Sequence, residues 1–248
     1  MSNRGSFYLR ESMDLVFDIK RVSLYLIVPP VLAFIVYFES YLSGVGATRI
    51  MSLRQNVLLA LWNSTILLSM IAGLQGGAFF SRLFGSSWFR NSLALPVRRM
   101  DGFLMPVAVY LALVSLFFAL TVFAILVAMP QPSGFAWPMA VINCYTPVLW
   151  SVAASALFGL LLRPASASFA FLAATVMGAV MGLEQAAAKL PGWISWPLGV
   201  LFPRLGESFL ASMGVESRGY ISVWVPLHAL ALLLLGVMAF RRLSAGSR

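Results

Sequence analysis

Residue types that carry chemistry are scarce in this chain. It holds a single histidine, His228, and a single cysteine, Cys144. An intrachain disulfide is therefore impossible, and a zinc site built from the cysteine and histidine side chains of one subunit is nearly excluded. His228 follows Pro226 in an apolar stretch, where it could serve a proton relay or bond to a neighbouring helix. We expect the chain to bind no metal or cofactor.

A few polar side chains lie within or beside apolar stretches. Glu39 and Glu184 fall near the ends of two such stretches, and Asn143 opens a polar run over residues 143–146. Such groups either line a path through a membrane, bind one helix to another or, for the carboxylates, reach the membrane interface. Glu39, Asn143 and Glu184 are therefore candidates for a pathway or gate.

The chain lacks the loop that cradles nucleotide phosphates. That loop needs Gly-x4-Gly-Lys-Ser/Thr, but the two lysines, Lys20 and Lys189, are followed by Arg21 and Leu190. We therefore expect no ATP hydrolysis by this route and no enzyme activity. An ATP-driven role would place ATP on a separate partner chain.

Composition indicates a membrane protein. Hydrophobic residues make up 60% of the chain and charged residues 10%, against about a quarter charged in soluble domains. Several apolar stretches are long enough to cross the roughly 30 Å hydrocarbon layer as helices. We predict one all-α membrane domain over residues 1–248, with six spans at about 22–42, 56–80, 103–129, 137–162, 167–188 and 220–240.

A short basic segment, residues 81–101, joins the second and third spans and predicts a cytoplasmic elbow. Ser86 and Ser87 can cap a short helix, which Pro96 then stops. The large apolar residues of this helix are Trp88, Phe89, Leu93 and Leu95. An exposed helix that carries such residues is expected to bind a partner.

This segment resembles the ABC-2 type transporter permeases. Members place a Gly, an amphipathic segment and a Leu-Pro motif with basic residues before a new span, and Gly85 and residues 92–99 (SLALPVRR) are similar. Members often have Glu before the Gly, where this chain has SRLF at residues 81–84. The resemblance implies an exporter subunit whose elbow couples to a separate ATPase, with two permease copies or a related second chain forming the path. The residues assigned to coupling are Trp88, Phe89, Arg90, Leu93, Leu95, Arg98 and Arg99.

Two further segments agree with this resemblance. Residues 6–21 place apolar and charged side chains on opposite sides of a helix, which predicts a helix lying flat on the membrane, as an anchor or near the ATPase. Residues 189–219 are apolar but interrupted by prolines, so they predict an outer re-entrant or interfacial hairpin, or a loop resting on the bilayer. Trp193 and Trp196 would lie at headgroup depth, and in the family such a segment is an outer gate.

The net charge of +9 follows the predicted topology. With a cytoplasmic N-terminus, 12 of the 17 basic residues fall inside: Arg4, Arg10, Lys20, Arg21, Arg82, Arg90, Arg98, Arg99, Arg163, Arg241, Arg242 and Arg248. This bias fits the positive-inside rule, with both termini cytoplasmic and the chain in the inner membrane. Arg49 and Arg54, in the first outer loop, go against it. A basic stripe with interleaved aromatics is missing, so no nucleic acid partner is expected.

Three functional classes are open from these patterns. The first is the permease subunit, with a lipid-like, glycan-linked or amphipathic peptide cargo suited to the apolar interior. The second is a secondary transporter or channel, which predicts internal repeats or mid-span charges. The third is an intramembrane enzyme, for which His228 is the sole candidate base.

Small residues predict where a second subunit could pack. Gly73, Gly76 and Gly77 lie in the second span, and Gly178 and Gly182 lie in the fifth. Because glycine lets helix backbones approach closely, we expect these positions to face the other subunit.

Overall fold

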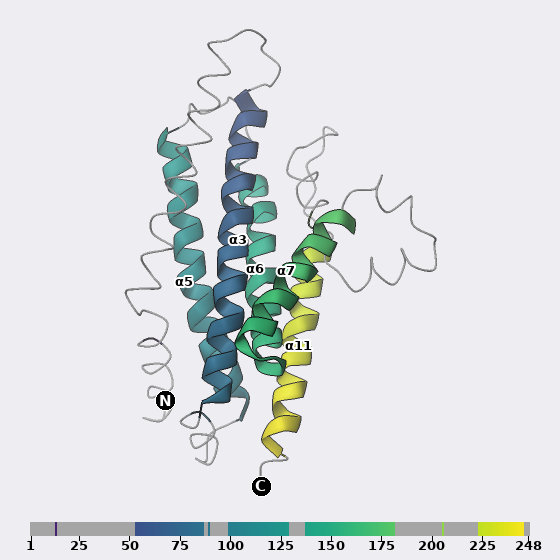
Figure 1. The fold of residues 1–248 in the computed structure, drawn as a ribbon. Coiled ribbons are helices and arrows are strands. Elements are labelled where there is room, and N and C mark those ends of the chain that lie inside the picture. Colours follow the sequence, from purple (N-terminus) through teal and green to yellow (C-terminus); the bar gives the residue numbers. More distant parts are fainter. Residues whose placement is uncertain are drawn as a thin grey trace.

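The computed structural model describes residues 13, 53–86, 89, 99–128, 137–181, 205 and 223–245. The elements in this part of the chain are all α-helices, and none of its residues lies in a strand. The helices are α3 (Leu53–Gly85), α5 (Arg99–Ala128), α6 (Trp137–Leu161), α7 (Pro164–Met181) and α11 (Trp224–Ala245), shown in Figure 1.

Four helices are long and apolar enough to cross a membrane: their spanning parts are Val57–Gly85, Met100–Val127, Trp137–Leu161 and Trp224–Leu243. The all-helical prediction is thus confirmed for the described residues, and the second, third, fourth and sixth predicted spans are helices. α3 continues past the predicted end at residue 80 to Gly85, and the apolar residues Leu83 and Phe84 belong to this last part. At 1.5 Å per residue α3 is about 50 Å long.

The fifth predicted span, 167–188, is described only in part. α7 has 18 residues, and its apolar portion, Pro164–Gly178, is shorter than the roughly 20 residues that a full span needs. Residues 182–188 lie outside the described residues, so this span stays a prediction.

Three other predicted segments fall almost wholly outside the described residues. They are the interfacial helix 6–21, the first span 22–42 and the re-entrant segment 189–219. Met13 is helical and 43% exposed. Leu205 is helical and buried in a cluster with Phe171 of α7 and Val225 of α11.

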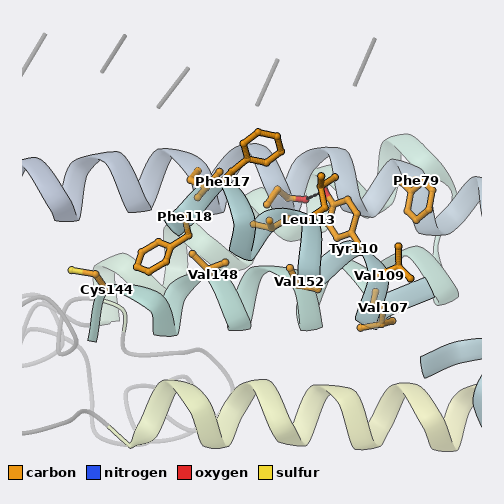
Figure 2. Packing of buried hydrophobic residues seen from close by; sticks show 14 of the residues in the cluster. Phe79, Val107, Val109, Tyr110, Leu113, Phe117, Phe118, Cys144, Val148 and Val152 are labelled. Atoms are coloured by element: carbon orange, nitrogen blue, oxygen red, sulfur yellow. Dashed lines mark hydrogen bonds between the residues drawn. The ribbon is translucent and has the colours of Figure 1, made fainter. Parts of the chain in front are cut away.

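α6 contacts each of the other four described helices and forms the centre of this part of the fold (Figure 1). Residues 151–157 are all buried, as expected for a helix that is apolar on every side and surrounded by others. Figure 2 shows Cys144, Val148 and Val152 on successive turns of α6, with Phe118 of α5 next to Val148. The core of the described helices therefore lies around α6.

α3 packs directly against α6 and runs in the same direction. A Cβ atom at Gly76 of α3 would lie 2.6 Å from the hydroxyl of Ser155 in α6. Four residues further along both helices, a Cβ atom at Gly159 would lie 2.5 Å from Cβ of Phe80. Both approaches are possible only because one side of each contact has no side chain.

α3 also packs closely against α7. A Cβ atom at Gly73 would overlap the ring of Phe171, and one at Gly77 would lie 3.3 Å from the backbone of Ala167. The prediction that Gly73, Gly76 and Gly77 face a second subunit is therefore wrong, because helices of the same chain cover all three. We call the stretch Ala72–Gly77 the glycine seam.

Two hydrogen bonds reach the backbone of the glycine seam. The Tyr110 hydroxyl of α5 donates to the carbonyl of Ala72 at 2.7 Å, and the Ser168 hydroxyl of α7 donates to the carbonyl of Leu74 at 2.8 Å. Because the neighbouring glycines have no side chains, groups on other helices can reach the Ala72 and Leu74 carbonyls. The seam therefore joins α3 to α5 and α7 by directional bonds as well as by packing.

The hydroxyl groups of α6 are satisfied mainly within that helix. Those of Thr146, Ser151 and Ser155 each donate to the carbonyl three residues earlier, at 2.8, 2.8 and 2.9 Å. Tyr145 makes a contact outside the helix, since its hydroxyl lies 2.5 Å from that of Ser115 in α5.

The outward faces of α5 and α11 are apolar. Their exposed large side chains include Leu116, Leu120, Phe123, Val127, Leu227, Leu230, Leu234, Leu235 and Met238. Such continuous apolar faces suit the acyl chains of a bilayer better than water.

Gly73→Ala tests the glycine seam. The added methyl group would overlap the Phe171 ring, so we expect a loss of about 1–3 kcal/mol, the usual cost of overpacking. The measurement is the thermal unfolding midpoint in detergent. Gly85→Ala is the matched control, because a Cβ there meets nothing within 4 Å, and it should leave the midpoint unchanged or slightly raised. Equal midpoints for the two variants would refute the close approach of α3 and α7.

Candidate functional site

The ends of several described helices meet at one end of the helix bundle. The Ser81 hydroxyl of α3 donates to the carbonyl of Leu162, in the turn between α6 and α7, at 2.6 Å. The guanidinium of Arg241 in α11 donates to the sulfur of Met100 in α5. Figure 1 shows the ends of α3, α5 and α11 together at its lower edge. The elbow that joins α3 to α5 belongs to this same end.

This end carries most of the basic residues of the described part, and we call it the basic end. They are Arg82, Arg99, Arg163, Arg241 and Arg242. Asp101, in the first turn of α5, is the only acidic residue among the described ones, and Arg54 lies at the opposite end of α3. The described helices therefore gather positive charge at one end.

Ser86 connects the end of α3 to the start of the elbow. Its hydroxyl donates to the carbonyl of Leu83 at 2.7 Å and accepts from the backbone N–H of Phe89 at 3.2 Å. The second bond joins a capping serine to the N–H three residues on, which is the geometry of a helix N-cap. The predicted capping role of Ser86 is thus confirmed, and Phe89 is helical.

Phe89 packs among the ends of three helices. Its ring centroid lies 5.2 Å from that of Phe84 in α3 and 5.8 Å from that of Phe240 in α11. Phe103 of α5 completes the group, 5.7 Å from Phe84 and 5.8 Å from Phe240. These spacings fall in the favourable range of about 4.5–7 Å for aromatic pairs. We call the four rings the Phe89 cluster.

The prediction that Phe89 is exposed is wrong. Its side chain is 2% exposed, because the rings of the Phe89 cluster remove it from solvent. Phe89 therefore contacts helices of its own chain. The cluster is tight on the α11 side as well, since a Cβ atom at Gly236 would lie 2.6 Å from the Phe103 ring.

Further ring contacts connect the Phe89 cluster with the glycine seam. Phe84 stacks on Phe80 with centroids 5.8 Å apart, and Phe80 lies 5.3 Å from the ring of Tyr110. Tyr110 in turn donates to the Ala72 carbonyl. A continuous set of packed aromatic side chains therefore runs from the elbow to the middle of α3.

Of the other predicted coupling residues, the structure describes only Arg99. Arg99 begins α5. The remaining ones lie outside the described residues: Trp88, Arg90, Leu93, Leu95 and Arg98. The sequence prediction missed Phe84, Phe103 and Phe240. Each of the three is an aromatic residue near the end of a predicted span, within four residues of an arginine. Nothing in the local sequence indicates that the three rings meet.

Among the predicted pathway residues, the structure describes Asn143. Its side chain is fully buried in α6. Pro147 has no N–H to donate to the carbonyl of Asn143, and the Thr146 hydroxyl donates to that carbonyl instead, at 2.8 Å. This replacement is how a serine or threonine stabilises a proline-containing membrane helix. Glu39, Glu184, Trp193 and Trp196 lie outside the described residues.

Within the part of the chain that the structure describes, the residues capable of acid, base or thiol chemistry form no cluster. His228 lies beside Trp224 with ring centroids 5.5 Å apart, and Cys144 is buried in α6. The described residues contain no group of three His, Cys, Asp or Glu side chains that could hold a metal ion. No protein-family model, curated protein or solved structure matches the chain.

Thr146→Val tests the bond that replaces the missing proline N–H. We expect a loss of about 1–3 kcal/mol in unfolding free energy, because the buried Asn143 carbonyl loses the hydroxyl donor that takes the place of the Pro147 N–H. Thr175→Val is the matched control: its hydroxyl donates to the Phe171 carbonyl at 2.9 Å, which keeps its helical N–H partner. Similar unfolding midpoints in detergent for both variants would contradict this account.

The Phe89 cluster is tested by a double-mutant cycle. Phe89→Ala and Phe240→Ala should each destabilise the protein, and the double variant should lose less than the sum, with an interaction of about 0.5–1.5 kcal/mol. The measurement is thermal unfolding in detergent. Phe123, 64% exposed on α5, supplies the control, since Phe123→Ala should add independently to Phe89→Ala. Strict additivity of Phe89 and Phe240 would show that their rings do not interact.

Proposed function

We propose that this chain is the transmembrane permease subunit of an ATP-binding-cassette exporter of the ABC-2 type, driven by a separate ATPase. The observation that carries the proposal is the packing of elbow residue Phe89 among the ends of α3, α5 and α11 at the basic end. A force applied to the elbow would act on all three helices through these rings. The resemblance of residues 92–99 to the family motif supports the same function.

The energy source must lie outside this chain. It lacks the Gly-x4-Gly-Lys-Ser/Thr loop that holds nucleotide phosphates, and its elbow offers Trp88 and Arg90 beside the buried Phe89. In our proposal, Trp88 and the arginines contact the ATPase, while Phe89 faces inward and transmits the movement. Closure of the ATPase dimer then tilts α3 and α5, and Phe240 brings α11 into the same movement.

The proposed orientation places the basic end in the cytoplasm. The gathering of Arg82, Arg163, Arg241 and Arg242 at one end supports this, because basic residues are retained on the cytoplasmic side during insertion. Both termini are then cytoplasmic, and the chain resides in the inner membrane.

The transport path in this proposal lies between two permease subunits. Six spans and an outer re-entrant segment, with Trp193 and Trp196 as part of an outer gate, complete each subunit. Glu39 and Glu184 are candidates for the ends of the path. Asn143 is buried by the helices of its own chain, so it can line a path only after α6 separates from its neighbours. A lipid-like, glycan-linked or amphipathic peptide cargo suits the apolar interior.

Affinity capture of the tagged protein in mild detergent, followed by mass spectrometry, tests the function. We expect a stoichiometric partner that carries a phosphate-binding loop. Recovery of the chain alone, even after crosslinking in the membrane, would count against the exporter and favour a secondary transporter or channel.

The elbow is tested in the same assay by Trp88→Ala combined with Arg90→Glu. Loss of a tryptophan anchor costs about 2 kcal/mol or more at an interface, so we expect at least a roughly 30-fold loss of captured ATPase with normal membrane insertion. Arg54→Glu, a charge reversal at the opposite end of α3, should retain the ATPase. Undiminished capture by the elbow variant would show that the partner binds elsewhere.

A further inference from the structure

Two exposed arginines come together at one corner of the basic end. Arg82 occupies the last turn of α3, and Arg163 lies in the turn between α6 and α7. The bond from the Ser81 hydroxyl to the Leu162 carbonyl, 2.6 Å long, joins the residues directly before each arginine. The fold thus brings the backbones of the two arginines to the same corner, although 80 residues separate them in sequence.

Their charge is not neutralised within the described part of the chain. Asp101 is the only acidic residue there, and it belongs to the first turn of α5, where the α11 residue Arg241 contacts the neighbouring Met100. The corner formed by Arg82 and Arg163 is therefore positively charged and open to an anionic partner.

The surface beside these arginines is apolar. Leu161 and Leu162, directly before Arg163, are 54% and 40% exposed. The exposed residues of α7 are Ala165, Ser166, Phe169, Ala173 and Val176, and the four apolar ones recur at helical spacing. Phe169 is 72% exposed and Val176 is 52% exposed. Residues spaced by three and four positions share a helix face, so a continuous apolar strip rises along α7 from the charged corner.

We propose that Arg82 and Arg163 bind the headgroup of an anionic phospholipid whose acyl chain lies along the exposed stripe of α7. A phospholipid combines a negatively charged headgroup with apolar acyl chains, and this surface combines a positively charged corner with an adjoining apolar strip. A protein bound at the cytoplasmic end could meet the arginines, but it would not reach Phe169 and Val176 within the bilayer. This inference requires that the helices cross a membrane and does not depend on the proposed exporter function.

The site is tested by titrating the detergent-purified protein with dioleoylphosphatidylglycerol and recording the thermal unfolding midpoint. A ligand that binds the folded state raises this midpoint. One arginine near an anionic surface contributes about fivefold in binding. The lipid concentration that gives half of the maximal shift in the midpoint should therefore be roughly 25-fold higher for the Arg82→Gln, Arg163→Gln double variant than for the unmodified protein. The Arg82→Lys, Arg163→Lys variant keeps the charges and should retain most of the response, which separates charge loss from misfolding.

Matched controls distinguish this site from general attraction. Arg242→Gln removes an exposed charge at the same end but on α11, and it should leave the titration unchanged, whereas Arg163→Gln shifts it about fivefold. Dioleoylphosphatidylcholine and glycerol 1-phosphate should each give a much smaller shift. The proposal is overturned if the neutral lipid matches the anionic one, if glycerol 1-phosphate alone gives the full shift, or if Arg242→Gln weakens the response as much as Arg163→Gln.

Discussion

The close approach of α3 to α6 and α7 is the constraint on which the rest of this structure depends. Within a bilayer, lipid is as apolar as leucine, so helices associate through packing and hydrogen bonds and gain little from hydrophobic burial. The glycine seam supplies both, since it admits Phe171 and Ser155 at contact distance and exposes carbonyls to Tyr110 and Ser168. A side chain at Gly73 or Gly76 would overlap Phe171 or Ser155, so α3 or these neighbours would have to shift.

The seam also determines what the basic end can do. α3 is held in its middle by three neighbouring helices, while its last turns extend to Gly85 and carry Phe80 and Phe84. The Phe89 cluster then joins that end to α5 and α11. Phe80, Ser81 and Leu83 are buried there as well, so the end of α3 is packed against its neighbours. In the proposed coupling, a push on the elbow would therefore move the ends of α3, α5 and α11 together.

Local features of this fold were predictable from the sequence, and contacts between distant segments were not. The span predicted at 137–162 is α6, because length and composition alone decide whether a helix can cross a membrane. The capping role of Ser86 was predictable because its hydroxyl and the backbone N–H that it accepts from, that of Phe89, are only three residues apart. The burial of Phe89 was not, since it depends on Phe240 at the far end of the chain. The glycines showed that a close contact exists, but a pattern on one helix does not say which helix fills it.

The hydroxyl groups of α6 have a mechanical consequence. Because Thr146, Ser151 and Ser155 donate to the backbone of their own helix, these three bonds would move with α6 if it shifted against its neighbours. The contact between the hydroxyls of Tyr145 and Ser115 joins α6 to α5 and would have to break in such a shift. The polar side chains of α6 thus include bonds that a movement of the helix preserves and one that it breaks.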